Sequence, residues 1–330
     1  MKITLAASIY PPEIGGPAQY AKSLKEALER AGHSVALVRY GGLKQFPSGI
    51  RHALYAIKLL FKSRGADAII AFDTYSGGLP AAIVRLLTAR PLIIRIGGDF
   101  VWELYIERTK DLVPLTEMYR HKEKWNWKEK IVFGVTRWVL KRALVVFSSR
   151  WLLDIWQSAY RIDANRVRVI ENAIGARVEP VAPQKKNFIF FARQIALKNA
   201  VAFRRAFAKA KTAHPEIVLE EGMIPHEELE KRMRECYAVA LPSISEVTPN
   251  YIIDAIRCGK PFLLTKYSGY AERFKEYGVI VDPQSKDDMA RGISELATPE
   301  IYERLRSRIA AFKESHTYDD IAREFVAVIT

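Results

Sequence analysis

Short apolar runs alternate along the whole chain with stretches whose apolar residues recur at helical spacing. In chain order, the runs are KITLAASI, SVALVRY, DAIIAF, PLIIRI, ALVVFS and RVRVI, then NFIFFA, EIVLEE, YAVALPS, PFLL and VIVD. Strands that alternate with helices are typical of parallel α/β layers. The pattern therefore predicts an α/β protein with a doubly wound parallel sheet in each half of the chain.

A stretch without helical period separates the two sets of runs. It reads ENAIGARVEPVAPQKK, residues 171–186, and is rich in proline, glycine and basic residues, which is typical of an interdomain linker. The predicted Rossmann-like domains are residues 1–170 and residues 187–312. Open α/β sheets bind ligands outside the carboxyl ends of their strands, so we expect a ligand cleft between the two domains.

The end of the chain, residues 313–330, is predicted to form a helix. Thr317 stands three positions before Asp320, which is a capping-box pattern, and the sequence continues amphipathically. We expect this helix to pack back toward the N-terminal domain.

The stretch SEVTPNYIIDAIRCGKP, residues 245–261, combines a helix pattern with two acids. Thr248 suits an N-cap and Pro249 the first helical position, so the pattern predicts a short buried helix over about 249–258. Glu246 then lies just outside the helix start. Asp254 lies two turns inside the helix. The two acids could bind a ligand, or they could be solvated acids without a function.

Length and composition indicate a folded two-domain protein. The chain has 330 residues, of which 49% are hydrophobic. Cys236 and Cys258 form neither a disulfide framework nor a metal-ligand pattern, which favours a reducing compartment. The sequence shows no secretion signal and no apolar stretch near the roughly 20 residues that span a bilayer. We therefore expect a cytoplasmic protein.

The net charge of +14 is unevenly distributed. Residues 1–170 hold 27 Lys and Arg against 14 Asp and Glu, whereas residues 171–330 hold 24 against 23. A strongly basic half favours a polyanion or an anionic membrane as partner.

A glycine turn follows the first strand run, in YPPEIGGPAQYAKSLKEALERAGH. Gly15 and Gly16 would let the backbone approach a ligand, and the helix that Pro17 opens would favour an anion at its N-terminus. A plain tight turn is the alternative. A dinucleotide-binding dehydrogenase is disfavoured, because G-x-G-x-x-G spacing is absent and the second strand run ends without a ribose-binding acid.

Two cations follow the first strand run of the second half, in NFIFFARQIALKN. Arg193 and Lys198 bracket the loop before the next helix. Such a pair can hold a diphosphate by a planar fork and a point charge, although ordinary exposed basic residues would look the same.

Taken in order, the glycine turn, the Arg and Lys pair, and two acids eight positions apart resemble the nucleotide-sugar-dependent glycosyltransferases of the GT-B fold, family 4. The run VIENAIG is similar to that family's turn out of the first domain. The resemblance implies a retaining transferase that takes a sugar from a UDP- or GDP-sugar. In it, Arg193 and Lys198 would bind the diphosphate, Glu246 the donor sugar and Asp254 the ribose.

The complete donor-binding set that the resemblance implies is Gly15, Gly16, Arg193, Lys198, Glu246, Thr248, Asn250 and Asp254. Family members need no metal, and the chain has no D-x-D pair and no histidine ligand spacing. We therefore expect no metal and no cofactor besides the donor substrate. The sequence departs from the family where Asp254 replaces the usual glutamate and where residues 247–250 replace a glycine-rich loop.

Family members also place a histidine after the fourth strand of the first domain, where this chain reads RIGGDFVWEL. Asp99 is the nearest polar candidate, with Glu103 behind it. Either side chain could steer an acceptor hydroxyl or take its proton. An acid that only shapes the turn is the alternative.

All six tryptophans lie between Trp102 and Trp156, inside the basic half. Residues 120–142 hold eight Lys and Arg against two Glu, and residues 51–64 form a basic amphipathic pattern without an acid. Aromatic and cationic side chains together favour an anionic membrane interface. They predict a peripheral protein at the inner face of the membrane with a glycan or lipid-linked acceptor, unless the tryptophans belong to the core. No nucleic-acid-binding motif is present, so nucleic acid is not expected.

Two other functions are compatible with the same fold. One is a sugar-nucleotide epimerase or a phosphorylase, the latter disfavoured because no cofactor lysine site is evident. The other is a non-catalytic protein that binds a membrane or nucleic acid. If the protein transfers a sugar and Glu246→Ala abolishes the transfer, the protein is an enzyme and not such a non-catalytic binding protein.

Overall fold

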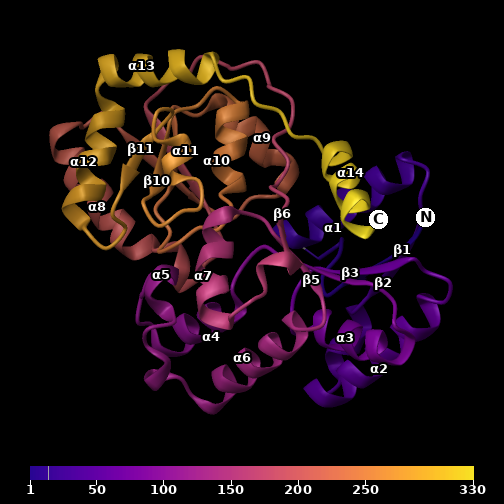
Figure 1. Ribbon diagram of the computed structural model, residues 1–330. Helices are drawn as coiled ribbons and strands as arrows, with labels where there is room; N and C mark the ends of the chain where they lie inside the picture. Colours follow the sequence, from indigo (N-terminus) through magenta and orange to yellow (C-terminus); the bar gives the residue numbers. More distant parts are fainter. Residues whose placement is uncertain (14) are drawn as a thin grey trace. The chain divides into compact units, whose positions relative to one another are not determined.

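The computed structural model describes residues 1–13 and 15–330, which form two compact units (Figure 1). Unit 1 comprises Met1–Val101, Lys124–Ala173 and His316–Thr330, and unit 2 comprises Trp102–Glu123 and Ile174–Ser315. The sequence had placed residues 102–123 in the first domain. The structure assigns them to unit 2 instead.

Unit 1 contains a six-stranded parallel sheet with the order β2-β1-β3-β4-β5-β6. Its strands are β1 (Lys2–Ala7), β2 (Ser34–Arg39), β3 (Ala68–Ala71), β4 (Leu92–Ile96), β5 (Leu144–Phe147) and β6 (Val167–Val169). Each coincides with one of the six apolar runs of the first half. The prediction of a parallel α/β sheet here is confirmed.

The helices of unit 1 begin after the strands that the sequence pattern predicted. They are α1 (Gly16–Arg30), η1 (Gly41–Gln45), α2 (Ser48–Lys62), α3 (Gly78–Thr88), α6 (Trp127–Leu140), α7 (Arg150–Tyr160), η3 (Ala164–Arg166) and α14 (Tyr318–Ile329), while α4 (Phe100–Thr109) and η2 (Lys122–Lys124) contain the unit boundary. Local capping fixes several starts, because Asn126 and Glu129 form a capping box at α6 and Ser149 caps α7.

The last helix, α14, belongs to unit 1 and packs against α1. Ile321 and Phe325 are fully buried in the same apolar cluster as Leu24 and Leu28 of α1. The capping box of Thr317 and Asp320 is present as the sequence predicted. The helix begins at Tyr318, not at residue 313.

Unit 2 contains a five-stranded parallel sheet with the order β11-β10-β9-β7-β8. Its strands are β7 (Asn187–Phe191), β8 (Val218–Gly222), β9 (Ala238–Leu241), β10 (Phe262–Thr265) and β11 (Val279–Val281). Read from β8, the order is that of the first five strands of unit 1. Both predicted sheets are therefore confirmed, and each has its second strand at one edge beside its first.

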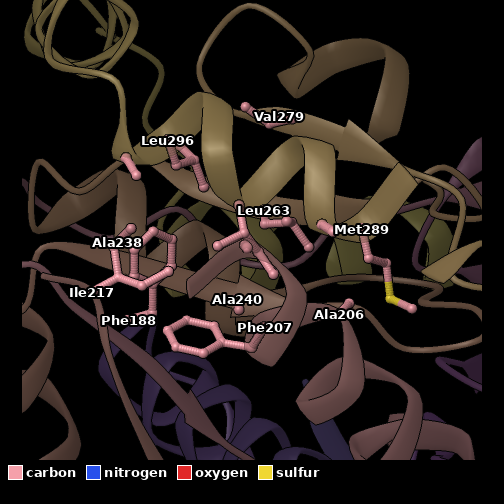
Figure 2. Close-up of a cluster of buried hydrophobic side chains, with 14 of the residues drawn as sticks. Phe188, Ala206, Phe207, Ile217, Ala238, Ala240, Leu263, Val279, Met289 and Leu296 are labelled. Atoms are coloured by element: carbon pink, nitrogen blue, oxygen red, sulfur yellow. The ribbon is translucent and has the colours of Figure 1, made fainter. Parts of the chain in front are cut away.

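Helices cover both faces of the unit 2 sheet. They are α5 (Leu115–Met118), η4 (Ala196–Lys198), α8 (Ala200–Ala213), α9 (His226–Glu235), α10 (Asn250–Arg257), α11 (Ala271–Phe274), α12 (Lys286–Ala297) and α13 (Pro299–Ala310). Figure 2 shows the core on one face, where Phe188 and Leu263 of the sheet meet Phe207 of α8 and Met289 of α12. Ile189, the neighbour of Phe188 on β7, faces a second cluster with Ile252 of α10.

The start of α10 differs from the prediction. Pro249, not Thr248, is the N-cap, and it makes no side-chain capping bond. The reason is a tight turn in which the Asn250 N–H donates to the Thr248 carbonyl at 3.0 Å, with Pro249 at φ −82° and ψ 70°. These angles are those of an inverse γ-turn, which takes Pro249 out of the helix.

The tryptophans were expected at a membrane interface, and three of them are instead core residues. Trp102, Trp125 and Trp156 are 5%, 4% and 2% exposed. Trp127 is 67% exposed. Among the described residues, no helix combines the length and the apolarity that crossing a bilayer requires.

Candidate functional site

The loops that follow β7 and β9 begin side by side at the carboxyl edge of the unit 2 sheet. The two strands pair in parallel, with Phe188 opposite Ala238, although β8 lies between them in the chain. Helix α8, which follows β7, packs on the Phe188 face, and α10, which follows β9, packs on the Ile189 face. Neighbouring strands whose helices leave to opposite faces open a crevice at their carboxyl ends, where such sheets bind ligands.

The loop after β7 carries the predicted cations. The Ile195 N–H donates to the Arg193 carbonyl at 2.9 Å, and the turn η4 then ends at Lys198. Asn199 follows in the left-handed region, at φ 58°, and α8 begins at the next residue. Lys198 is therefore held between a helical turn and a sharp reversal of the chain.

The loop after β9 carries Glu246, whose backbone is fixed on both sides. Its N–H donates to the Tyr267 carbonyl and its carbonyl accepts from the Gly269 N–H, both at 3.0 Å. These bonds attach Glu246 to the loop after β10. The Ile244 N–H also donates to the Leu197 carbonyl at 2.9 Å, which ties the loops after β9 and β7 together.

The structure brings the Lys198 ammonium and the Glu246 carboxylate into direct contact as an ion pair. The two side chains are 21% and 14% exposed, so the pair is half-buried and still reachable from solvent. An ammonium has three donors, and a carboxylate accepts about four hydrogen bonds. The pair therefore keeps capacity for an anion on one side and for hydroxyl groups on the other.

Asn199 joins three loops at the same edge of the sheet. Its side-chain amide donates to the Pro242 carbonyl at 3.2 Å and to the Pro283 carbonyl at 2.8 Å, and the residue is 5% exposed. These carbonyls belong to the loops after β9 and β11. The sequence analysis missed this residue, because its function depends on partners 43 and 84 positions away.

The remaining predicted residues of unit 2 lie on the loops after β7 and β9 and on α10. Arg193 is exposed. Asp254 lies in the second turn of α10 and pairs with Arg257 at 2.8 Å. Thr248 is half-buried in the turn before α10, and Asn250, the first residue of the helix, is exposed. The first turn of α10 contains no acid, so its positive N-terminal end stays available to an anion.

Glu107 of α4 is a further charged residue beside the loop after β7. It accepts the Ala196 N–H at 3.2 Å. Its bond to the Lys110 ammonium lowers the pKa of the carboxyl, and the Ala196 N–H and the Arg193 charge lower it further. Glu107 therefore stays ionised at neutral pH. No sequence signal identified it.

In unit 1, the glycine turn forms the start of α1. Gly15 has φ 153°, a conformation that other residues rarely adopt, and its carbonyl accepts the N–H groups of Ala18 and Gln19 at 3.1 and 3.2 Å. Gly16 is the first residue of the helix. Both glycines follow β1, which lies at the point where the strand order of unit 1 reverses.

Asp99 follows β4 as expected, but it is only 1% exposed. Its Oδ2 accepts the Trp156 indole N–H at 2.8 Å. A carboxylate with this partner fixes the packing of Trp156, which is a structural function. A function in handling the acceptor stays a prediction. Glu103 lies on α4, in the part that belongs to unit 2.

Among the side chains that the structure describes, no three His, Cys, Asp or Glu come together as a potential metal site. The charges gathered at the unit 2 centre are instead one ammonium, one carboxylate and a helix N-terminus. This combination suits the binding of a phosphate ester that also carries hydroxyl groups.

Comparison with protein families agrees with this chemistry. The model described as Glycosyltransferase Family 4 matches residues 14–176, and the model described as Glycosyl transferases group 1 matches residues 222–314. The chain is a glycosyltransferase of the GT-B fold. It belongs to the family 4 type. No curated protein matches the chain.

Solved structures share the fold over the whole length at low sequence identity. Sucrose-phosphate synthase from Thermosynechococcus elongatus matches with a TM-score of 0.70 and 16% identity, covering 99% of this chain and 98% of that one. HepE from Anabaena in complex with UDP matches with a TM-score of 0.65 and 16% identity, covering 100% and 99%. WaaG, a glycosyltransferase involved in lipopolysaccharide biosynthesis, matches with a TM-score of 0.68 and 12% identity, covering 100% of both chains.

Proposed function

We propose that the protein transfers a sugar from a nucleoside-diphosphate sugar, which binds at the carboxyl edge of the unit 2 sheet. The observation that carries the proposal is the half-buried Lys198–Glu246 pair in the loops that follow the paired strands β7 and β9. Lys198 and the exposed Arg193 bind the diphosphate. Glu246 accepts hydrogen bonds from hydroxyl groups of the donor sugar. Asp254 holds the ribose, which requires it to share its carboxylate with Arg257.

The chemistry of the reaction explains why these residue types are needed. When the bond between the sugar and the diphosphate breaks, negative charge grows on the departing phosphate. A fixed cation beside that phosphate stabilises the transition state more than the bound substrate. One such donor typically contributes about 3 kcal/mol. Lys198 can supply it, because the donor diphosphate would replace part of its contact with Glu246.

The donor class is supported by HepE, which was solved with UDP, with UDP and glucose, and with UDP-glucose. We propose a UDP- or GDP-sugar for this chain. We further propose retention of the donor's anomeric configuration and activity without a divalent ion. Lys198, Arg193 and the N-terminus of α10 can balance the diphosphate charge without a metal.

Thermal unfolding with UDP, GDP, ADP and CDP tests the donor site directly. A ligand at a hundred times its dissociation constant stabilises the folded protein by about 2.7 kcal/mol, which shifts the unfolding midpoint measurably. We expect one nucleotide to stabilise the native protein and Lys198→Ala to lose most of the shift. If none of the four shifts the midpoint, the proposed donor site is wrong. Product stereochemistry and activity in EDTA then test retention and metal independence.

We also propose that unit 1 lies on an anionic membrane that presents a lipid-linked acceptor. More than half of the exposed large apolar side chains among the described residues lie on α2, α3 and α6, and α3 contacts both other helices. They are Ile50, Leu54, Ile57 and Phe61 on α2, Ile83, Leu86 and Leu87 on α3, and Trp127 and Ile131 on α6. On α2 they follow intervals of four, three and four residues, which places them on one face.

The charges on these three helices are almost all positive. Helices α2 and α3 contain no Asp or Glu, and Glu129, the acid of α6, is 1% exposed. The cations are Arg51, Lys58, Lys62, Arg85, Lys128, Lys130 and Arg137. Apolar side chains among cations bind anionic bilayers, where each charge contributes about 1 kcal/mol. The sequence predicted that residues 51–64 and 120–142 contact the membrane. Because residues 120–123 belong to unit 2, the face on unit 1 comprises only the later part of the second segment.

Flotation with vesicles tests this face with a closely matched control. Leu86 and Leu87 are 60% and 69% exposed, as are Val201 and Met223 of unit 2. We expect Leu86→Ser with Leu87→Ser to weaken binding to vesicles that contain phosphatidylglycerol by about tenfold or more, since each buried leucine contributes about 2 kcal/mol. Val201→Ser with Met223→Ser should leave it unchanged. Equal effects of both pairs would contradict the proposed surface.

A further inference from the structure

Unit 1 has a second candidate binding site, which lies at the amino ends of β4 and β5, opposite the edge where such sheets bind their substrates. It is a hollow of roughly 180 Å³. Its lining combines three arginines, Arg85, Arg142 and Arg166, with apolar residues such as Leu92 and Leu144. None of the lining residues is an aspartate or glutamate.

Each arginine of the hollow is held in place by a backbone carbonyl. Arg85 donates to the Arg90 carbonyl at 3.0 Å, Arg142 to the Trp138 carbonyl at 2.9 Å, and Arg166 to the Lys141 carbonyl at 2.6 Å. The guanidinium of Arg142 also stacks on the Trp138 ring at 3.9 Å. A guanidinium has five N–H groups, so each arginine is fixed while most of its donors stay available.

The three arginines of the hollow carry positive charge that no described side chain balances by an ion pair. None of Arg85, Arg142 and Arg166 forms an ion pair within the described residues, and all three are half-buried. An anion with several oxygens would balance this charge and accept hydrogen bonds from the remaining N–H groups of the three arginines.

The surroundings of the hollow point to the source of that anion. Leu86 and Leu87 follow Arg85 directly on α3 and are 60% and 69% exposed. They belong to the apolar face that unit 1 is proposed to place on a membrane. A phosphate that enters the hollow and remains attached to acyl chains beside these leucines would use both features. Arginine forks match the oxygens of a phosphate.

We propose that the hollow of Arg85, Arg142 and Arg166 binds the phosphate of an anionic phospholipid head group. The inference rests on the membrane contact proposed above, but not on the donor site of unit 2. Such a site would make membrane binding depend on the phosphate group of the lipid, and not only on the negative charge of the membrane surface. It also fixes one point of unit 1 on the bilayer surface, which diffuse charge attraction does not do.

Vesicle binding of paired variants tests the proposal. The first double variant combines Arg85→Gln and Arg166→Gln. The control double variant combines Arg150→Gln and Arg161→Gln, and it removes the same charge from exposed arginines of unit 1 outside the hollow. On phosphatidylglycerol vesicles the first pair should bind at least tenfold more weakly than the second. On vesicles with equal surface charge supplied by a fatty acid, the two pairs should bind alike. Equal binding of the pairs on phosphatidylglycerol overturns the proposal.

A second measurement separates a lipid from a free ion. Inorganic phosphate is titrated into the unchanged protein and into the Arg85→Gln, Arg166→Gln variant by calorimetry, after circular dichroism has shown that the variant is folded. We expect no binding, or binding only at millimolar phosphate, because the acyl chains are missing. Micromolar phosphate binding that the variant loses, without a change in vesicle binding, shows a soluble ligand and overturns the lipid assignment. Nucleotide-induced stabilisation is measured separately on the unchanged protein, so the donor site and the hollow fail independently.

Discussion

The ammonium of Lys198 contacts the carboxylate of Glu246 across 48 positions of sequence. The two residues come from the loops after β7 and β9, which are neighbours at the point where the strand order of unit 2 reverses. Without a ligand, each charge therefore balances the other. The diphosphate that we propose at Lys198 would compete with Glu246 for this ammonium, so nucleotide affinity should depend on the charge of Glu246.

Replacing Glu246 by glutamine should separate binding from catalysis. Glu246→Gln leaves Lys198 without its negative partner, so we expect a nucleoside diphosphate to bind more tightly, by a few-fold. Sugar transfer should fall by about a hundredfold or more, because the carboxylate proposed to hold the donor sugar is lost. Calorimetry with the nucleotide and a transfer assay measure the two effects. Weaker nucleotide binding by this variant would show that Glu246 does not compete for Lys198.

Replacing Lys198 by alanine should lower the transfer rate constant about 10²- to 10³-fold, since the cation proposed to lie beside the departing phosphate is lost. Lys209→Ala is the matched control. Lys209 lies on α8 in the same unit and pairs with Asp287 at 2.7 Å, where both side chains are more than half exposed. The control should keep nearly full activity. If both variants lose activity equally, the position of Lys198 beside Glu246 does not explain its contribution to sugar transfer.

Asn199 should be important for the stability of the loops that form the site. Asn199→Gly keeps the left-handed backbone at φ 58° but removes the bonds to the Pro242 and Pro283 carbonyls. We expect unfolding free energy to fall by about 1–3 kcal/mol, measured by chemical denaturation. Asn199→Ala should cost about 1 kcal/mol more, because a non-glycine residue without a polar side chain disfavours this conformation. Equal stability of both variants would contradict the backbone argument.

The sequence predicted all eleven strands. The inner strands form continuous apolar runs because both of their faces are buried, whereas the partly exposed edge strands β2, β6 and β8 were predicted from short apolar runs between helical patterns. The sequence singled out Lys198 and Glu246 by their places after strand ends and before a helix, and the resemblance to family 4 implied their roles. It did not predict their direct contact. That contact depends on the bonds of Ile244 to Leu197 and of Glu246 to the loop after β10, which join segments that no local pattern connects.

Burial was harder to predict than strand position. Arg95 stands in the run PLIIRI, yet it is 5% exposed, donates to Asn172 and stacks on Tyr20 at 4.0 Å. Trp125 and Trp156 appeared suited to an interface and are core residues. Arginine and tryptophan side chains have both apolar and polar parts, so they can lie in the core or at the surface. Which of the two they occupy depends on their tertiary contacts. Leu86 and Leu87, in contrast, are exposed although their residue type favours the core.

Both cysteines should be unreactive in the folded protein. Cys236 and Cys258 are 0% and 1% exposed, and burial raises the pKa of their thiols to about 12 and about 11. The thiolate is the reactive form, so at pH 8 about one thiol in a thousand or fewer is reactive. A chromogenic disulfide reagent should therefore titrate no thiol in the native protein and two after denaturation. Rapid native reaction of either cysteine would contradict the burial.

The same thiols should make unit 2 less stable at alkaline pH. In the unfolded chain each thiol ionises near pH 8.5, whereas in the folded protein its pKa is higher, so the unfolded state binds fewer protons above that pH. Stability is thus fully present below pH 8.5 and declines as the pH rises toward 11. Cys258→Ala should reduce this decline, measured as unfolding free energy at pH 7 and pH 10.

The packing of α14 on α1 should be maintained by its apolar side and not by its surface ion pair. Phe325 is fully buried among Leu24 and Leu28, whereas Asp319 pairs with Arg30 at 2.6 Å with both side chains 57% exposed. We expect Phe325→Ala to lower the unfolding free energy of unit 1 by about 3–5 kcal/mol. Asp319→Ala should lower it by less than about 1 kcal/mol, because exposed ion pairs are weak.

Hydrogen exchange distinguishes these outcomes within unit 1. After Phe325→Ala, the amides of α14 and of the facing α1 should exchange faster, because the cluster that joins the two helices loses its aromatic side chain. After Asp319→Ala, exchange in both helices should match the unchanged protein. A large effect of Asp319→Ala with none of Phe325→Ala would mean that charge, and not apolar burial, attaches the last helix to unit 1.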